Sequence, residues 1–436
     1  MLTAFAQAFR TPDLRKKLLF TLGIILLFRL GSQVPTPGVD TQAINTCLEP
    51  ALDEGGIYGL INLFSGGALL QLAIFALGIM PYITASIIIQ LLVVVIPRLE
   101  TLKKEGQAGT AKLTQYTRYL TIALAILQST ALIAIARQPG RLLQGCDLPL
   151  IHEDIGWFGI VTMVAIMTAG TGVIMWMGEM ITDKGVGNGM SVLIFTQIAA
   201  TFPQQLWQIK VVEGWFVFIC VCAAGLVLVA AVVFVEQAQR RIPVQYAKRM
   251  IGRRMYGGTS TYIPLKVNQA GIIPVIFASS LLYLPALATQ ISDDKNSGWA
   301  LWIQKYFTTG DHPIYMASFF VLIVFFAFFY VAITFNPKEL ADNMKKYGGF
   351  IPGIRAGRPT EEYLDYVLNR ITTAGALYLG VIALIPMVAI GILGSSATQQ
   401  FPFGGASILI IVGVGLDTVK QIQSQLQQRN YEGFLR

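Results

Sequence analysis

Long apolar runs recur along the whole chain, and they restrict its possible folds more than any other feature. A helix needs roughly 20 apolar residues to cross the hydrocarbon core of a bilayer. Only 13% of the residues are charged, whereas soluble domains carry about 25%. We therefore predict an all-α polytopic membrane protein. Its ten expected spans are Leu18–Val34, Leu69–Ile96, Tyr119–Ala136, Trp157–Gly178, Met190–Leu206, Trp215–Val235, Val267–Ile291, Tyr315–Phe335, Ile371–Leu393 and Phe403–Leu416.

Positive charge is divided unevenly between the two sets of loops that these spans create. The N-terminus and the loops 97–118, 179–189, 236–266, 336–370 and 417–436 hold 26 of the 32 Lys and Arg residues. The loops on the other side hold five. Because short cytoplasmic loops carry the excess of Lys and Arg, we expect the first set and both termini to lie in the cytoplasm.

The loop 207–214 divides the spans into five and five. Because five is odd, the two halves enter the membrane from opposite sides, as in an inverted-topology repeat. The sequence therefore predicts an N-terminal half, 1–206, and a C-terminal half, 207–436, with a functional site near the midplane between them.

Residues that carry chemistry are scarce inside the predicted spans. Arg29 is the only ionisable residue there, and it lies near the outer end of its span, where a snorkelling anchor is the favoured interpretation. His152 and His312 both fall in external loops, and no nucleotide-binding or hydrolase motif occurs. We expect no enzyme activity, metal or cofactor. An inverted-repeat secondary transporter of small solutes and an intramembrane enzyme stay open as alternatives, although the transporter would need buried ion-coupling groups.

Two cysteines, Cys47 and Cys146, fall in loops on the predicted outer side, where disulfides can persist. We predict that they pair. Cys220 and Cys222 lie two residues apart within one span, so they point to different helix faces and are expected to pack rather than chelate.

A short apolar segment, at about 57–67, lies between the first two spans. It is too short to cross the bilayer, and apolar backbone of this kind fits a re-entrant or cavity-filling piece. Gly66 and Gly67 supply a hinge before the second span. A loop packed on the outer surface is the alternative.

Ordered motifs along the chain resemble the SecY family of bacterial protein-conducting channels. The motifs are Asn62–Gly67 continuing through Ile74–Gln90, Lys103–Gly106, Gln115–Tyr119, Gly187–Gly189, Gln239–Ile242, Tyr246–Arg249, Pro264–Gly271, Asn336–Pro337, Ala341–Asn343, Pro352–Arg355 and Phe403–Gly405. The resemblance implies two five-helix halves around a central hourglass pore.

The resemblance also implies a constriction of aliphatic side chains, which excludes water and ions. The matching ring positions are Ile79, Ile83, Met190, Ile194, Ile276 and Ile410. Met190 departs from the usual isoleucine, and its flexible thioether should still seal. The segment at about 57–67 matches the family's plug, which closes the resting channel from outside. The plug positions are Ile61, Asn62, Leu63, Phe64, Ser65, Gly66 and Gly67.

A lateral gate toward lipid, between the second and seventh spans with the third alongside, is a further implication of the resemblance. Its matching polar positions are Thr84, Gln128 and Asn268. Hydrogen bonds across such an interface would stabilise closure by roughly 0.6–2 kcal/mol. An apolar signal sequence could displace bonds of that strength.

The cytoplasmic loops 236–266 and 336–370 are a second expected functional surface. The first holds seven basic residues against one acid, more than orientation alone requires, and paired arginines suit phosphate or carboxylate partners. The resemblance implies docking of the ribosome and the SecA ATPase here. The docking positions are Arg240, Arg241, Arg253, Arg254, Arg355 and Tyr431.

Taken together, these features predict a channel that translocates unfolded preproteins across the bacterial plasma membrane and releases hydrophobic segments laterally into lipid. The resemblance implies SecE and SecG as further subunits and signal sequences as ligands.

Overall fold

The computed structural model describes most of the chain as helix. The described residues are 9, 11–44, 46, 68–69, 71–137, 148–152, 155–246, 249–251, 254–256, 260–291, 298–303, 306, 312–393 and 405–432. The helices that carry the argument in the first part of the chain are α2 (Pro12–Gly31), α5 (Met80–Val95), α6 (Pro97–Lys104), α7 (Gln107–Ala136), α8 (Trp157–Lys184) and α9 (Gly189–Gln237). Those that follow are α10 (Ile273–Ile291), α11 (Gly298–Ile303), α12 (Pro313–Thr334), α13 (Pro337–Lys346), α14 (Arg358–Leu393) and α15 (Gly405–Glu432).

The helices confirm a polytopic α-helical membrane protein. Within the described residues, five helical stretches are long and apolar enough to cross a bilayer, and the bent pair α5–α6 adds a sixth if it is counted as one span. The five are Gln107–Ala136, Trp157–Lys184, Gly214–Gln237, Pro313–Lys346 and Arg358–Ile385. The other predicted spans coincide with α2, the first part of α9, α10 and α15, which are shorter or less apolar.

The second predicted span begins 11 residues later than the sequence suggested, at Met80 instead of Leu69. The stretch before it is buried but made of turns, with positive φ at Leu72 (45°) and Gly78 (57°). Its backbone is paired with the segment after α2, because the Ile74 N–H donates to the Val34 carbonyl at 2.9 Å. Irregular backbone at membrane depth is tolerated where protein surrounds it in this way.

The predicted loop 207–214 is helical over almost its whole length. Helix α9 continues from Gly189 past Leu206, and its break comes at Gly214, where φ is 85° and ψ is 180°. Only glycine adopts this backbone conformation without strain. Because Gly214 is the residue inside α9 with non-helical φ and ψ, it marks the point where the fifth and sixth predicted spans separate.

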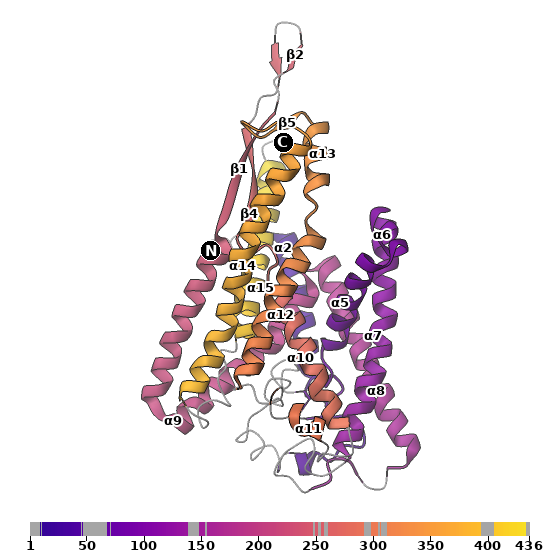
Figure 1. Cartoon of the computed structure of the whole chain (residues 1–436). Helices are drawn as coiled ribbons and strands as arrows, with labels where there is room; N and C mark the ends of the chain where they lie inside the picture. The colour runs from indigo at the N-terminus through magenta and orange to yellow at the C-terminus, as the bar shows by residue number, and fades with distance from the viewer. Residues whose placement is uncertain are drawn as a thin grey trace.

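The described strands of loop 236–266 form a β-hairpin, and its tip projects beyond the helices (Figure 1). Strand β1 (Gln239–Tyr246) pairs antiparallel with β4 (Ser260–Lys266), and β5 (Gly349–Phe350) adds to the other edge of β1. The hairpin tip carries β2 (Arg249–Ile251) and β3 (Arg254–Tyr256). The alternation of buried and exposed residues explains why this segment forms a strand. In β1, Ile242 and Val244 are buried, whereas the residue between them and those before Ile242 are exposed.

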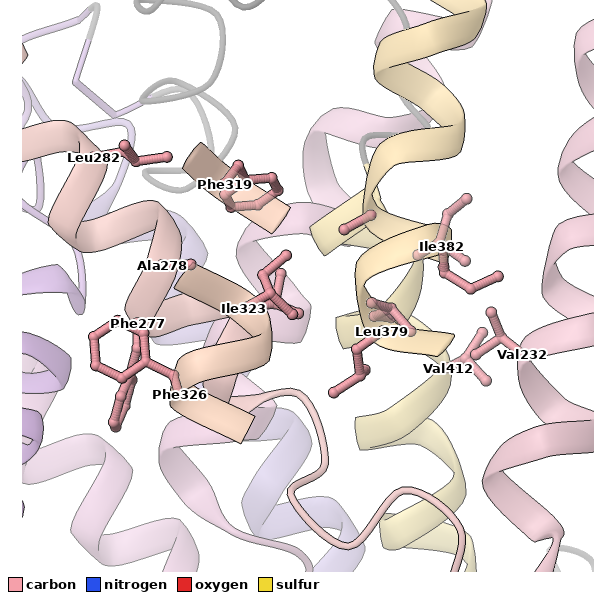
Figure 2. Close-up of a cluster of buried hydrophobic side chains, with 14 of the residues drawn as sticks. Val232, Phe277, Ala278, Leu282, Phe319, Ile323, Phe326, Leu379, Ile382 and Val412 are labelled. Carbon is pink, nitrogen blue, oxygen red and sulfur yellow. The ribbon is translucent and has the colours of Figure 1, made fainter. Parts of the chain in front are cut away.

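Buried apolar side chains form several separate clusters. One lies in the second part of the chain, where α9, α10, α12, α14 and α15 converge (Figure 2). In it, Phe277 of α10 packs edge-on against Phe326 of α12, with ring centroids 5.4 Å apart. Another, the central cluster, draws on both parts of the chain. Its buried members are Ile24, Phe28, Phe75, Ile79, Ile174, Met177, Ile181, Val192, Leu193, Ile194, Ile198, Ile276, Ile410 and Val414.

Candidate functional site

All six ring positions lie in or against the central cluster. Four of them, Ile79, Ile194, Ile276 and Ile410, are buried there with exposed fractions of 1%, 6%, 7% and 0%. The other two, Ile83 and Met190, are partly buried and pack against the same cluster. The six residues come from α5 and the turn before it, from the start of α9, from α10 and from α15. Elements from both parts of the chain therefore meet at one aliphatic contact.

Local sequence fixes how α9 presents its two ring residues. Asn188 caps the helix, because its Oδ1 accepts from the Met190 N–H at 3.1 Å and the Ser191 N–H at 3.4 Å. Met190 and Ile194 lie one turn apart and so share a face. Helix α8 approaches closely through glycine: a Cβ on Gly178 would lie 2.4 Å from the Met190 Sδ. A Cβ on Gly189 would lie 1.8 Å from the Gly178 carbonyl oxygen.

The turn-rich segment before α5 holds Ile79 in place. The Phe75 ring stacks on Phe28 of α2, with centroids 5.8 Å apart. A Cβ on Gly31 would lie 2.2 Å from the Phe75 ring, so glycine leaves the space that the ring fills. Tertiary contacts with α2 therefore position the first ring residue, which stands at the N-cap of α5.

The helices expected to form the lateral gate are in contact. Helix α10 packs mainly on α12 and also contacts α5 and α7. Ile87 of α5 reaches across to pack against the cluster of the second part of the chain. The α5–α10 contact therefore lies between the two parts of the chain, as the expected gate requires.

The three polar gate positions are not linked to one another by any hydrogen bond within the described residues. Thr84 donates to the Met80 carbonyl of its own helix at 3.0 Å, and Gln128 is half-buried on α7. Asn268 lies in the turn between β4 and α10, is 2% exposed, and donates to Glu236 Oε1 at the end of α9. It also donates to the Gly271 carbonyl at 3.2 Å. Asn268 therefore ties α10 to α9.

The two loops that were expected on the cytoplasmic side contact each other at the hairpin end of the molecule (Figure 1). Strand β5 brings loop 336–370 against β1, with Gln245 opposite Phe350. Arg240 and Arg241 are exposed on β1, and the Arg241 guanidinium lies 4.8 Å from the centre of the Tyr262 ring. Arg355 is exposed on the adjoining loop. Three of the expected docking residues thus lie on neighbouring segments.

Several expected site residues fall outside the described part of the structure. They are the plug residues Ile61, Asn62, Leu63, Phe64, Ser65, Gly66 and Gly67, together with Cys47, Cys146 and Arg253. The side chains of Arg254 and Tyr431 are also outside it. Segments beside the two cysteines are described, and they are paired: Val39 forms an antiparallel bridge with Ile151, and the Asp40 N–H donates to the Leu150 carbonyl at 3.0 Å.

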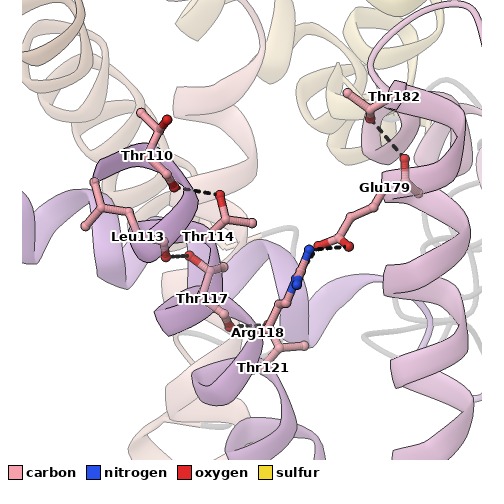
Figure 3. A network of polar contacts seen from close by, with 9 residues as sticks. Thr110, Leu113, Thr114, Thr117, Arg118, Thr121, Glu179 and Thr182 are labelled. Atoms are coloured by element: carbon pink, nitrogen blue, oxygen red, sulfur yellow. Dashed lines mark hydrogen bonds and ion pairs between the residues drawn. The ribbon is translucent and has the colours of Figure 1, made fainter. Parts of the chain in front are cut away.

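An ion pair between α7 and α8 was not anticipated from the sequence. Arg118 donates through Nε and Nη2 to the two carboxylate oxygens of Glu179, each at 2.8 Å (Figure 3). Such paired geometry is the strongest that a guanidinium and a carboxylate form. The sequence held only a weak signal for this ion pair: each of the two residues lies where a predicted span meets a predicted cytoplasmic loop. The pair joins α7 to α8 on the same side as the docking loops.

The profile of the SecY family matches residues 73–419. The chain belongs to the SecY family. The SecY protein translocase subunit of Streptomyces galbus is 69% identical over the full length of both chains, and that of Streptomyces coelicolor is 68% identical. The SecY protein translocase subunit of Mycobacterium tuberculosis is 59% identical, again over both full lengths.

Solved structures share the SecY fold at lower identity. One, described as a protein-conducting channel, superposes with a TM-score of 0.62 over 94% of this chain and 91% of its own, at 18% identity. A SecY structure concerned with the plug domain, said to stabilise the closed state and maintain the membrane seal, gives 0.61 at 19% identity. Sec61 from a canine ribosome–channel complex gives 0.59 at 18% identity. At such identities, these matches show the fold.

Proposed function

We propose that this SecY-family chain passes unfolded preproteins through the six-residue aliphatic ring and releases apolar segments sideways between α5 and α10. The chain is a channel subunit of a protein translocase. The observation that carries the route is the central cluster, in which ring residues from α5, α9, α10 and α15 meet. We place the boundary between an N-terminal half, 1–206, and a C-terminal half, 207–436, beside the break at Gly214.

The chemistry of the ring suits a seal that must open for any sequence. Its aliphatic side chains offer water and ions no partner, so a narrow contact between them stays dry. Side chains with no polar atoms also lose no hydrogen bonds when a polypeptide pushes them apart. In this proposal the driving energy comes from partners, because the chain itself acts as the passage and not as an enzyme.

The lateral exit lies where α10 contacts α5 and α7. These contacts tie α10 less firmly than its packing on α12, which includes the Phe277–Phe326 pair. An apolar signal sequence would compete with α10 for the surfaces of α5 and α7, because the signal, the helix faces and the surrounding lipid are all apolar. The segment at about 57–67 would close the outer side of the ring at rest.

The hairpin and loop 336–370 form the proposed docking surface. Exposed Arg240, Arg241 and Arg355 provide guanidinium groups suited to carboxylates and to RNA phosphates. We infer that SecA and the ribosome bind here. The proposed location is the bacterial plasma membrane, with both termini in the cytoplasm and with SecE and SecG as companion subunits.

A disulfide between Cys47 and Cys146 is proposed for the outer side. The bridge between Val39 and Ile151 supports it, because it holds the two loops that contain the cysteines side by side. On a non-reducing gel, Cys47→Ser should change the mobility of the chain, since the closed loop opens. Unchanged mobility, with free thiols in the wild type, would contradict the pairing.

Reconstitution tests the function. The purified chain with SecE and SecG is placed in liposomes with SecA, ATP and a radiolabelled preprotein. We expect the preprotein to become protected from external protease only when ATP is present. Liposomes without the chain and liposomes with an ATP-free reaction are the controls. Uptake of small solutes without preprotein protection would instead favour the inverted-repeat transporter.

A further inference from the structure

Three ring helices carry a polar residue one helical turn beyond the ring, on the side away from the hairpin. These residues, the polar layer, are Gln197 on α9, Ser280 on α10 and Ser407 on α15. Gln197 and Ser407 are each 1% exposed. The ring residues that they follow are Ile194, Ile276 and Ile410. The layer therefore lies directly along the route that leaves the ring.

Helical spacing places Gln197 on the ring face of α9. Residues 190, 194, 197 and 201 recur at intervals of four, three and four, which forms one stripe along an α-helix. Met190 and Ile194 on this stripe belong to the ring contact. Any movement that separates the ring residues of α9 from the other helices therefore also uncovers Gln197.

Two of the three residues in this layer, Gln197 and Ser280, have polar atoms without partners in the part of the chain that the structure describes. Both amide atoms of Gln197 and the Oγ of Ser280 are buried with no hydrogen bond. Neighbouring hydroxyls off the layer are satisfied locally: Thr196 donates to the Val192 carbonyl at 2.8 Å, and Ser279 donates to the Ile276 carbonyl at 2.9 Å. An unpaired buried amide lowers stability, so its presence calls for an explanation.

We propose that the polar layer binds the peptide backbone of the extended chain as it leaves the aliphatic ring. The inference rests on the proposed route through the ring. An extended polypeptide presents N–H and C=O groups at each residue, about 3.3 Å apart, and the ring offers them nothing. The primary amide of Gln197 both donates and accepts, as a peptide group does. Binding of this kind would be independent of side-chain sequence, as a general channel needs.

The layer also has a consequence for the resting channel. While the ring is closed, the Gln197 amide is buried and unpaired, which destabilises the closed state. In the conducting state the passing backbone supplies its partners. A leucine at position 197 should therefore stabilise the resting protein and slow conduction.

Substitutions of Gln197 test the proposal in proteoliposomes with SecE, SecG, SecA and ATP. We expect Gln197→Leu to lower the translocation rate about threefold to tenfold, the loss that corresponds to one hydrogen bond. Two preproteins of different composition should be slowed equally, and the melting temperature of the resting channel should rise. Gln197→Asn should restore part of the rate. Thr196→Val, which removes a hydroxyl from another face of α9, should change neither quantity.

Crosslinking gives a readout that does not depend on rate. In a chain whose native cysteines are replaced, Gln197→Cys should form a disulfide with a cysteine in an arrested preprotein, and Thr196→Cys should not. A wild-type rate in Gln197→Leu, or no crosslink at 197, would overturn the polar layer. If the wild type itself fails to translocate, the proposed function fails instead.

Discussion

Ile410 shows what a ring position requires. Its side chain is fully buried in the central cluster, whose buried members are all apolar. The sequence motif around Phe403–Gly405 placed Ile410 only by resemblance. Burial against residues from α5, α9 and α10 supplies the physical reason for an aliphatic side chain there.

We predict that Ile410→Asn makes the resting channel leak ions. An unpaired buried amide costs about 1–3 kcal/mol, which favours a wetted ring by about 5- to 150-fold. Ion conductance of liposomes that contain the channel but no preprotein measures the effect. Ile410→Val, which keeps the ring aliphatic, is the matched control and should stay closed. Equal conductance in the two variants would remove Ile410 from the seal.

Asn268 acts through a partner that the sequence did not indicate. The gate assignment placed it opposite Thr84 and Gln128, whereas its amide donates to Glu236. The two residues are 32 positions apart, with the whole hairpin between them. Only the return of β4 alongside β1 brings them together.

We predict that Asn268→Leu changes which signal sequences the channel accepts, because it frees the start of α10 from α9. It should also lower stability by about 1–3 kcal/mol, since the half-buried Glu236 loses its donor. Translocation of preproteins with graded signal hydrophobicity, together with thermal unfolding, measures both effects. Glu236→Gln keeps a hydrogen-bonding group and is expected to behave more like the wild type. An unchanged signal spectrum in Asn268→Leu would argue against a gating role.

Among the elements, α8 and the start of α9 depend on small residues where they meet. Gly178 and Gly189 let the two helices approach each other. A Cβ added at either position would lie in close contact with the other helix. The contacts differ in kind. The neighbour of Gly178 is the flexible end of Met190, whereas the neighbour of Gly189 is backbone.

We predict that Gly189→Ala destabilises the protein more than Gly178→Ala does. Overpacking costs about 1–3 kcal/mol, and a flexible methionine can move aside whereas a backbone carbonyl cannot. Thermal unfolding of the purified channel in detergent compares the two variants. A substitution in open space, Gly23→Ala on α2, should change little. A smaller effect at Gly189 than at Gly178 would show that the backbones separate easily.

At the scale of the molecule, the structure joins two loops that the sequence treated separately. Pairing of β5 with β1 brings the loop that carries Arg355 beside the strand that carries Arg240 and Arg241. A partner that docks there can contact both loops at once. Electrostatic docking of this kind weakens as salt is raised.

We predict that Arg355→Glu weakens the binding of SecA and lowers translocation, while the chain still inserts and folds. Binding to proteoliposomes at low and high salt, together with preprotein protection, gives the measurement. Lys112→Glu, a charge reversal at an exposed position of α7, is the control and should bind SecA normally. Normal binding in Arg355→Glu would refute its place in the docking surface.

The sequence by itself showed that this is a membrane protein. Apolar runs long enough to span a bilayer are stable as helices within lipid. The sequence motifs assigned six positions to the expected ring by resemblance, and that assignment stays a prediction. Tertiary structure alone decided the turns at 68–69 and 71–79, the helical course of 207–213 and the hairpin in loop 236–266. Each of these depends on partners distant in sequence, such as α2 beside Phe75 or β4 beside β1, and local composition does not encode such partners. The unpaired amide of Gln197 belongs to the same class, because only packing shows that a polar residue has no partner.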